Sequence, residues 1–223
     1  MEHRITARDG RVLAVQENGP RDGLPVLVFW GTPNSRHLPP SVVADATARG
    51  IRLIGYDRPG YGRSDPQPGR VIASCAPDVR DICAVLGISR LAAWGGSGGG
   101  PHVLACAALL PDLVVAAATL ASLAPYPADG LDWFAGTGQD NIDSSMLALT
   151  DPAASREMLE KHRAACLAAS AEDLHAEMST LLSPADRAVM TGELARYLKF
   201  TYDEGLAPGV EGYWGDEQAF VSP

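Results

Sequence analysis

The sequence lacks the features that mark several large classes of protein. No apolar run is long enough to span a bilayer, and the opening residues MEHRITARDGR lack the basic-then-apolar pattern of a secretory signal. The cysteines show no C-x-x-C spacing that would predict a zinc or redox site, and three of the four lie in apolar stretches expected to be helical: Cys75, Cys83, Cys106 and Cys166. We therefore expect a cytoplasmic protein with reduced, buried cysteines and no membrane partner.

Positive charge is also scarce. The chain has 18 Lys and Arg against 27 Asp and Glu, a net charge of −9, which argues against a nucleic-acid partner because phosphate binding needs clustered cations. Residues 1–128 hold 12 basic and 10 acidic side chains, whereas residues 129–223 hold 6 and 17. The contrast suggests two modules, although solvated acidic faces on a helix-rich second half would also explain it, and we favour that interpretation.

The first half alternates short apolar runs with helical patterns. A hairpin is expected to turn at Asp9-Gly10. Four near-continuous apolar runs follow, typical of parallel strands covered on both faces: Pro25–Trp30, Ile51–Asp57, Arg90–Gly95 and Leu113–Ala121. Helices are expected between them at about 40–49, 76–86 and 98–110, the first two ending at Gly50 and Gly87. This order predicts a doubly wound, mostly parallel α/β sheet.

The second half is different, because helix signals follow one another without an intervening strand. The expected starts are Asp151-Pro152, the capping box Ser170-x-x-Asp173, and Ser183-Pro184, with a stop at Gly205. In an α/β protein such a block is an inserted lid or cap. We therefore divide the chain into an α/β core at 1–125 and a helical cap at 126–223.

The strongest chemical motif is Gly95-Gly96-Ser97-Gly98-Gly99, a G-x-S-x-G sequence between an expected strand and an expected helix. A serine at such a sharp turn takes a strained backbone, and only glycine fits two positions to either side. A dinucleotide-binding pattern fails because Pro101 stands where a third glycine is needed, and no Gly-Lys-Ser/Thr marks a phosphate loop. We interpret Ser97 as a nucleophile, with Gly95 and Gly99 as the glycines of its elbow, over the alternative of a structural glycine turn.

Two further motifs carry a resemblance to a known family. Phe29–Arg36 reads FWGTPNSR, and Tyr56–Asp65 reads YDRPGYGRSD. Together with the serine motif, these segments resemble the α/β-hydrolase family, near the proline iminopeptidase type. The resemblance implies that the backbone N–H groups of Thr32 and Gly98 hold an oxyanion. Trp30 stands where the family usually has histidine, which leaves a main-chain donor in place.

The resemblance also implies what this chain lacks. In the family the catalytic acid and then the histidine follow the serine along the chain, after the cap. The chain would then be truncated after the cap, without the last two strands, and the run Leu113–Ala121 would be an exposed edge. Among the histidines present, His102 lies on the serine's own helix and should point away from the hydroxyl, with packing or a backbone bond as its role. His37 could line the pocket, whereas His162 and His175 are expected to be solvated and His3 irrelevant.

These observations favour a serine hydrolase that cleaves an ester, amide or related acyl bond of a small molecule through Ser97. We expect no cofactor and no metal, and little activity from this chain alone because the acid and histidine positions are absent. One alternative is a catalytically dead scaffold that binds a ligand or a protein partner. Another is that a second polypeptide supplies the last strands, or a second copy pairs, at the exposed sheet edge.

Overall fold

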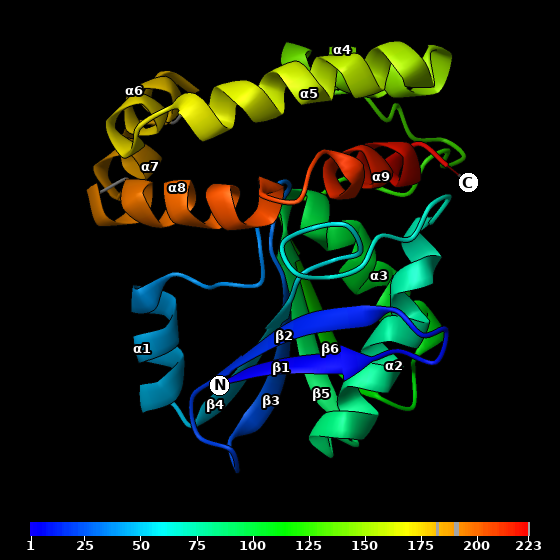
Figure 1. Ribbon diagram of the computed structural model, residues 1–223, viewed down its shortest axis with the longest axis vertical. Helices are drawn as coiled ribbons and strands as arrows, with labels where there is room; N and C mark the ends of the chain where they lie inside the picture. The colour runs from blue at the N-terminus through cyan, green and yellow to red at the C-terminus, as the bar shows by residue number, and fades with distance from the viewer. Residues whose placement is uncertain (182, 190–191, 223) are drawn as a thin grey trace.

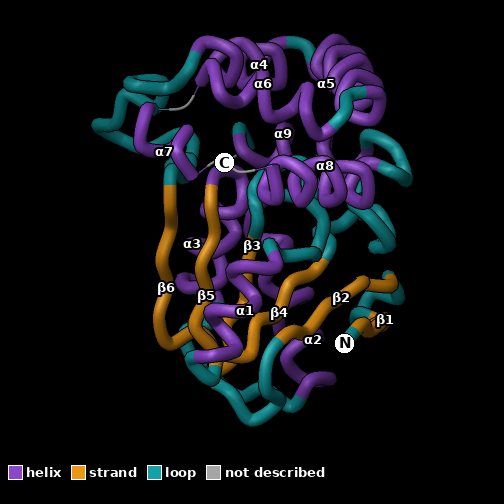
Figure 2. The backbone as a smooth tube through the Cα atoms, turned by 90° about the vertical axis from the view of Figure 1, so that its left-hand side faces the viewer, coloured by secondary structure: helices purple, strands orange, loops and turns teal. Residues whose placement is uncertain are grey.

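A computed structural model of the chain describes residues 1–181, 183–189 and 192–222. A six-stranded sheet forms its lower half (Figures 1 and 2), in the spatial order β1-β2-β4-β3-β5-β6. The strands are β1 (Glu2–Thr6), β2 (Val12–Asn18), β3 (Leu24–Phe29), β4 (Ile51–Tyr56), β5 (Leu91–Gly96) and β6 (Val114–Leu120). The prediction of a mostly parallel sheet in an α/β fold is therefore confirmed.

The pairing follows the sequence pattern. β1 and β2 form the expected antiparallel hairpin, in which Thr6 pairs with Val12 and Gly10 has a φ of 90°. β2 joins β4 antiparallel, and the pairs β4–β3, β3–β5 and β5–β6 are parallel. The carboxyl ends of the parallel strands consequently meet at one edge of the sheet, which faces the helical layer in Figure 1.

Helices cover both faces of the sheet. On one face α1 (Pro40–Ala48) packs with Val26, Val28 and Leu53. On the other face lie α2 (Cys75–Leu86), preceded by the short η1 (Ile72–Ser74), and α3 (Gly100–Leu109). Their buried side chains join those of the strands in the main core, which includes Leu27, Ile54, Val79, Ile82 and Val103. Gly87 ends α2 with a φ of 68°, as its sequence predicts.

The second half forms a helical layer above the carboxyl ends of the strands (Figure 1). Its helices are α4 (Gln139–Thr150), α5 (Pro152–Ala168), α6 (Ala171–Leu181), α7 (Pro184–Val189), α8 (Gly192–Leu206) and α9 (Glu211–Phe220). The predicted starts of α5 and α6 are confirmed, because Asp151 accepts from the Ala154 N–H at 3.0 Å and the Ser170 hydroxyl accepts from the Asp173 N–H at 3.0 Å. At the start of α7, the Ser183 hydroxyl accepts from the Asp186 N–H at 3.2 Å.

Gly205 does not stop its helix, so that prediction is wrong. The residue lies inside α8, which ends at Leu206. A Cβ at this position would come within 2.4 Å of the Pro33 carbonyl oxygen. Glycine is required here because α8 packs closely on the loop after β3, a contact between segments far apart in the sequence.

β6 is the edge strand of the described sheet, as Figure 2 shows. From Val115 to Leu120 its residues are exposed, with 48% of Val115 and 58% of Leu120 accessible. The expected apolar edge is therefore present, and pairing of a second chain along it stays a prediction. The four cysteines are free and buried, as predicted. None of the described helices combines the length and apolarity needed to cross a membrane.

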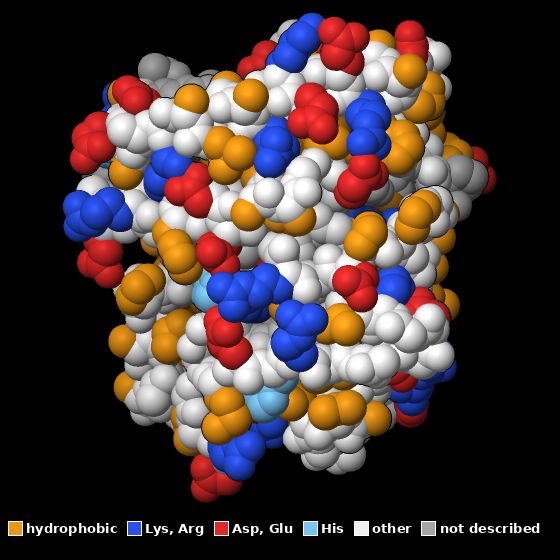
Figure 3. Space-filling view, in the orientation of Figure 1, with side chains coloured by type: hydrophobic (Ala, Val, Ile, Leu, Met, Phe, Trp, Pro, Cys, Tyr) orange, Lys and Arg blue, Asp and Glu red, His pale blue; other side chains and the backbone are white. Residues whose placement is uncertain are grey.

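Acidic and basic side chains alternate over the face of the molecule drawn in Figure 3, on the sheet half and on the helical layer alike. Exposed ion pairs of the molecule include Arg156 with Glu211 and Arg80 with Asp112. On this face the acidic excess of the second half therefore does not gather into a single patch.

Candidate active site

Ser97 stands at the sharp turn between β5 and α3. It begins a single 3₁₀ turn, η2 (Ser97–Gly99), and its φ is 50°, in the left-handed region that residues other than glycine rarely adopt. The same combination of strand, strained serine and helix is what the glycine spacing predicts. The turn lifts Ser97 to the carboxyl edge of the sheet, below the helical layer.

Close backbone contacts explain the glycines around Ser97. A Cβ at Gly95 would lie 2.8 Å from the Phe29 carbonyl oxygen, and a Cβ at Gly99 would lie 2.0 Å from the same atom. The neighbouring strand β3, which ends at Phe29, therefore leaves no room for a side chain at either position. At Gly96 the nearest atom would be 3.8 Å away, so this position has room for one.

The loop after β3 lies against the same turn. A Cβ at Gly31 would be 3.3 Å from the Ser97 Cβ, and a Cβ at Gly98 would be 2.1 Å from the Thr32 hydroxyl. Thr32 and Gly98 are therefore immediate neighbours beside Ser97. Two backbone N–H donors must be close neighbours if they are to share one oxyanion.

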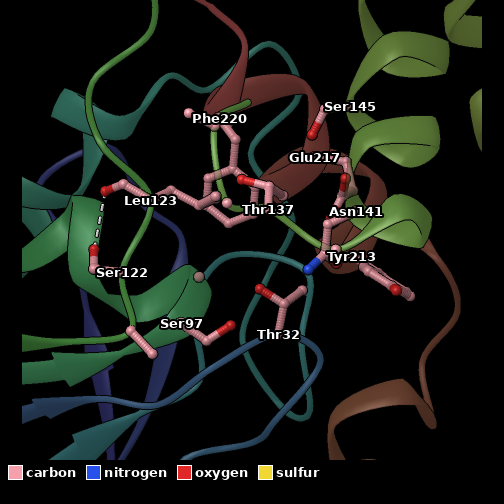
Figure 4. Close-up of a pocket in the computed structure, with 15 residues that line it drawn as sticks. Thr32, Ser97, Ser122, Leu123, Thr137, Asn141, Ser145, Tyr213, Glu217 and Phe220 are labelled. Atoms are coloured by element: carbon pink, nitrogen blue, oxygen red, sulfur yellow. Dashed lines mark hydrogen bonds between the residues drawn. The ribbon is translucent and has the colours of Figure 1, made fainter. Parts of the chain in front are cut away.

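A cavity of about 450 Å³ opens above Ser97. Figure 4 shows two opposite sides. The Ser97 side comprises Thr32, Ser97 and Gly98, and the α4/α9 side comprises Asn141, Ser145, Tyr213 and Glu217. Between them Ala121–Leu123, Ala135–Gly138 and Phe220 complete the wall. The volume suits a small molecule, and hydroxyl, amide and carboxyl groups make the lining polar.

Glu217 carries the one carboxyl among the described residues that line the cavity. One of its oxygens accepts a hydrogen bond of 2.8 Å from the Ser144 hydroxyl. Burial raises the pKa of Glu217 to about 7, although this hydrogen bond acts in the opposite direction. In the part of the chain that the structure describes, no Lys, Arg or His forms an ion pair with it. Its charge therefore changes near neutral pH, inside the cavity.

A sequence model of the family described as "alpha/beta hydrolase fold" matches residues 25–199, which include the strained turn, the loop after β3 and most of the helical layer. The chain belongs to the α/β-hydrolase family.

Other α/β-hydrolases are similar over part of this chain. A non-heme chloroperoxidase of Streptomyces lividans is 34% identical over 122 residues, which is 54% of this chain and 44% of that protein. The 3-oxoadipate enol-lactonase 1 of Acinetobacter baylyi is 33% identical over 96 residues, 43% of this chain and 36% of that enzyme. The matches thus span less than half the length of either relative.

The fold extends the likeness further than the sequence does. The crystal structure of an enol-lactonase from Burkholderia xenovorans LB400 superposes with a TM-score of 0.67 at 17% identity, covering 99% of this chain and 74% of that one. Nearly the whole of the described chain, helical layer included, therefore has the α/β-hydrolase fold. These comparisons do not resolve a proline iminopeptidase branch.

No histidine in the described part of this α/β-hydrolase lines the cavity above Ser97. His102 is buried behind the turn, and its Nδ1 lies 3.1 Å from the Gly98 carbonyl oxygen, which confirms the expected backbone bond. The sequence left open that His37 lines the pocket, but it is not among the residues that line the cavity. It packs on Phe200 of α8 and lies 3.7 Å from Glu204. His162 is exposed and bonds the Tyr213 hydroxyl at 3.0 Å. Among the described residues, none hydrogen-bonds with the Ser97 hydroxyl.

Sequence reasoning missed the α4/α9 side of the cavity. Glu217 lies in EGYWGDEQAF, which carries no catalytic or binding motif, and Asn141 and Ser145 lie on a helix that begins without a side-chain cap. The adjacent acidic pair Asp216-Glu217, two residues after Trp214, was the available signal. No group of three or more His, Cys, Asp or Glu side chains suited to a metal ion occurs in the described ranges.

Proposed function

We propose that this chain carries the nucleophile, the oxyanion hole and the cap of a serine hydrolase that cleaves an ester, amide or related acyl bond of a small molecule. The observation that carries the proposal is the strained backbone of Ser97, with a φ of 50°, at a glycine-walled turn that opens into the cavity. The names of the similar proteins support it, since each denotes an enzyme. They do not favour a scaffold without catalysis.

The chemistry assigns a role to each residue of the Ser97 side. The Ser97 Oγ attacks the acyl carbon, and the carbonyl π electrons move to the oxygen. The N–H groups of Thr32 and Gly98 stabilise the resulting oxyanion, and the N-terminal end of α3 adds its positive dipole. The Ser97 proton passes to solvent during the attack. Collapse of the intermediate breaks the acyl C–O or C–N bond, and the leaving group takes a proton from solvent and departs as the alcohol or amine. Water then hydrolyses the acyl-Ser97 and restores the hydroxyl. The proposed cap, residues 126–223, shapes the part of the cavity that receives the rest of the substrate.

The proton of Ser97 needs an acceptor that the described contacts do not provide. In the best-studied serine hydrolase, loss of the catalytic histidine lowers kcat on the order of a millionfold. The oxyanion hole and substrate binding still leave some catalysis over water. We therefore expect this chain alone to cleave activated esters slowly, with a dependence on Ser97.

Ester hydrolysis with two matched variants tests the proposal. Ser97 and Ser122 both line the cavity, and the Ser122 hydroxyl donates to the Leu123 carbonyl oxygen at 2.9 Å. With a p-nitrophenyl ester of a short acid, Ser97→Ala should abolish the slow release of nitrophenol, whereas Ser122→Ala should retain it. Equal rates for the parent chain and Ser97→Ala would refute the role of Ser97.

A further inference from the structure

Asp216 is a fully buried carboxylate on α9, one residue before Glu217, and it points away from the cavity into the core. Its Oδ2 accepts hydrogen bonds from Arg58 Nη2 at 2.7 Å, Arg58 Nε at 3.0 Å and the Tyr61 hydroxyl at 2.9 Å. Arg70 Nη1 lies 2.6 Å from its Oδ1. A single carboxylate from the helical layer thus binds two buried arginines of the core.

The partner Arg58 reaches the loop that carries Thr32. Its Nη1 donates to the Trp30 carbonyl oxygen at 2.6 Å, while Nε and Nη2 remain on Asp216. The planar guanidinium therefore ties the carboxylate on α9 to the backbone two residues before the first proposed oxyanion donor. Arg70 makes a different connection, because its Nη2 donates to the Gly212 carbonyl oxygen of α9 itself at 2.8 Å.

The face of α9 that carries Asp216 also packs against Gly98, whose N–H is the second proposed oxyanion donor. Phe220 lies one turn after Asp216, and a Cβ at Gly98 would come within 2.8 Å of its ring. His102, whose Nδ1 lies 3.1 Å from the Gly98 carbonyl oxygen, places its Nε2 3.6 Å from Asp216 Oδ1. The carbonyl can only accept, so Nδ1 carries the proton of the neutral ring.

We propose that Asp216 is a positioning residue for both arms of the oxyanion hole, the Thr32 arm through Arg58 and the Gly98 arm through the packed face of α9. This inference rests on the function proposed for Ser97, Thr32 and Gly98. Docking of α9 on the core and assembly of the oxyanion hole are then one event. Helix α9, at the end of the proposed cap, then sets the positions of the Thr32 and Gly98 donors and also forms part of the cavity wall.

The charges of this cluster are stable around neutral pH. Burial alone would raise the pKa of Asp216, but the nearby Arg58 and Arg70 outweigh it and hold that pKa well below the usual value. Burial lowers the pKa of His102 to about 3, so its ring is neutral. Neither Asp216 nor His102 therefore changes its charge between pH 5 and 8, so a change of pH cannot replace a mutation in the test.

Backbone NMR of the intact chain tests the proposal without any need for catalysis. Arg58→Lys keeps the charge beside Asp216 but loses the fork that also reaches the Trp30 carbonyl. Arg70→Lys is the matched control, because Arg70 binds the same carboxylate and makes no contact with the Thr32 loop. We expect the Thr32 amide resonance to shift in Arg58→Lys and to stay in place in Arg70→Lys. Equal shifts in both variants, or none in Arg58→Lys, would overturn the Thr32 arm.

Asp216→Asn should shift the amide resonances of both Thr32 and Gly98. Its control is Asp78→Asn. This variant removes the charge of a buried carboxylate on α2 that Arg11 binds and that does not line the cavity. If both Asn variants lower Tm but only Asp216→Asn moves the two resonances, the effect is positional and not general destabilisation. If Asp78→Asn moves them equally, or Asp216→Asn leaves them unmoved, the proposal fails.

The positioning role of Asp216 and the catalytic role of Ser97 can be refuted independently of each other. The resonances report the position of the donors whether or not Ser97 reacts. Where Ser97 does react with an ester, Arg58→Lys should slow the reaction by about tenfold to a hundredfold, the cost expected for a small misplacement of catalytic groups. An unchanged rate together with unmoved resonances would refute the positioning role while leaving the role of Ser97 intact.

Discussion

The two sides of the cavity are built by different means. On the Ser97 side the geometry is set by backbone packing: glycines 95 and 99 lie against the carbonyl of Phe29, and Ser97 itself holds a φ of 50°. On the α4/α9 side it is set by side chains on two helices, with Glu217 bonded to Ser144 across the space between them. Polar side chains rather than a tight turn define that surface.

This difference separates two requirements of the same reaction. Attack on an acyl carbon needs a hydroxyl and two donors fixed within a fraction of an ångström, which a backbone without room for side chains provides. Recognition of the rest of a substrate needs adjustable chemistry. Substitutions on the Ser97 side should therefore act on folding and geometry, and those on the α4/α9 side on charge and binding.

The largest expected effect is that of Gly99→Ala. The new Cβ would lie 2.0 Å from a backbone oxygen of β3, so the strand or the turn must move. We expect a loss of about 3 kcal/mol or more in the free energy of unfolding, measured with urea. Gly138→Ala is the control beside α4, where a Cβ meets nothing within 4 Å, and should cost less than about 1 kcal/mol. If both variants lost a similar amount of unfolding free energy, the Ser97 side would not be packed more tightly than the α4/α9 side.

A smaller effect is expected at Ser97. Glycine adopts the positive φ of this position without strain, whereas alanine does not. Ser97→Gly should therefore unfold at a higher Tm than Ser97→Ala, by the equivalent of about 1 kcal/mol. Neither variant retains the hydroxyl, so the comparison isolates the backbone. Identical Tm values would show that the turn is not strained.

An effect of similar size concerns pH and the α4/α9 side. The pKa of Glu217 is raised to about 7 from an ordinary value of 4.5, so the folded chain binds more protons than the unfolded chain between those values. Stability should fall as pH rises from about 4.5 to 7, and Glu217→Gln should remove on the order of 1 to 2 kcal/mol of that fall.

Glu211 supplies the control of opposite sign. Its exposed partner Arg156 lowers the pKa of Glu211. The contribution of this residue to the stability of the folded chain should therefore be small and should be lost as pH falls below 4.5. Thermal unfolding measured from about pH 3 to pH 8 distinguishes the two residues, because Glu217 acts above pH 4.5 and Glu211 below it. A Glu217→Gln variant with the pH profile of the parent chain would mean that Glu217 ionises as an ordinary exposed carboxyl.

The sequence predicts the Ser97 side better than the α4/α9 side, for a physical reason. The hairpin at Asp9-Gly10 and the apolar strands depend on neighbours within a few residues, so their spacing is visible in the chain. The elbow packs on the distant Phe29, but its glycines keep a fixed spacing around Ser97 that is visible as well. The α4 helix begins after Gly138 with no side-chain cap, and no start signal marks it. Asp216 binds Arg58, which lies 158 positions earlier in the chain. Gly205 has no room for a side chain because the Pro33 carbonyl oxygen of a distant loop lies against it. Such contacts exist only once the helical layer has packed on the core.

The most direct test of the account is intact-mass spectrometry of the chain after treatment with a fluorophosphonate, followed by mapping of the modified peptide. The account predicts one adduct, on Ser97, which is absent in Ser97→Ala and present in Ser122→Ala. An adduct that persists in Ser97→Ala, or a chain that takes up none after prolonged treatment, would contradict the claim that the strained turn holds a reactive serine.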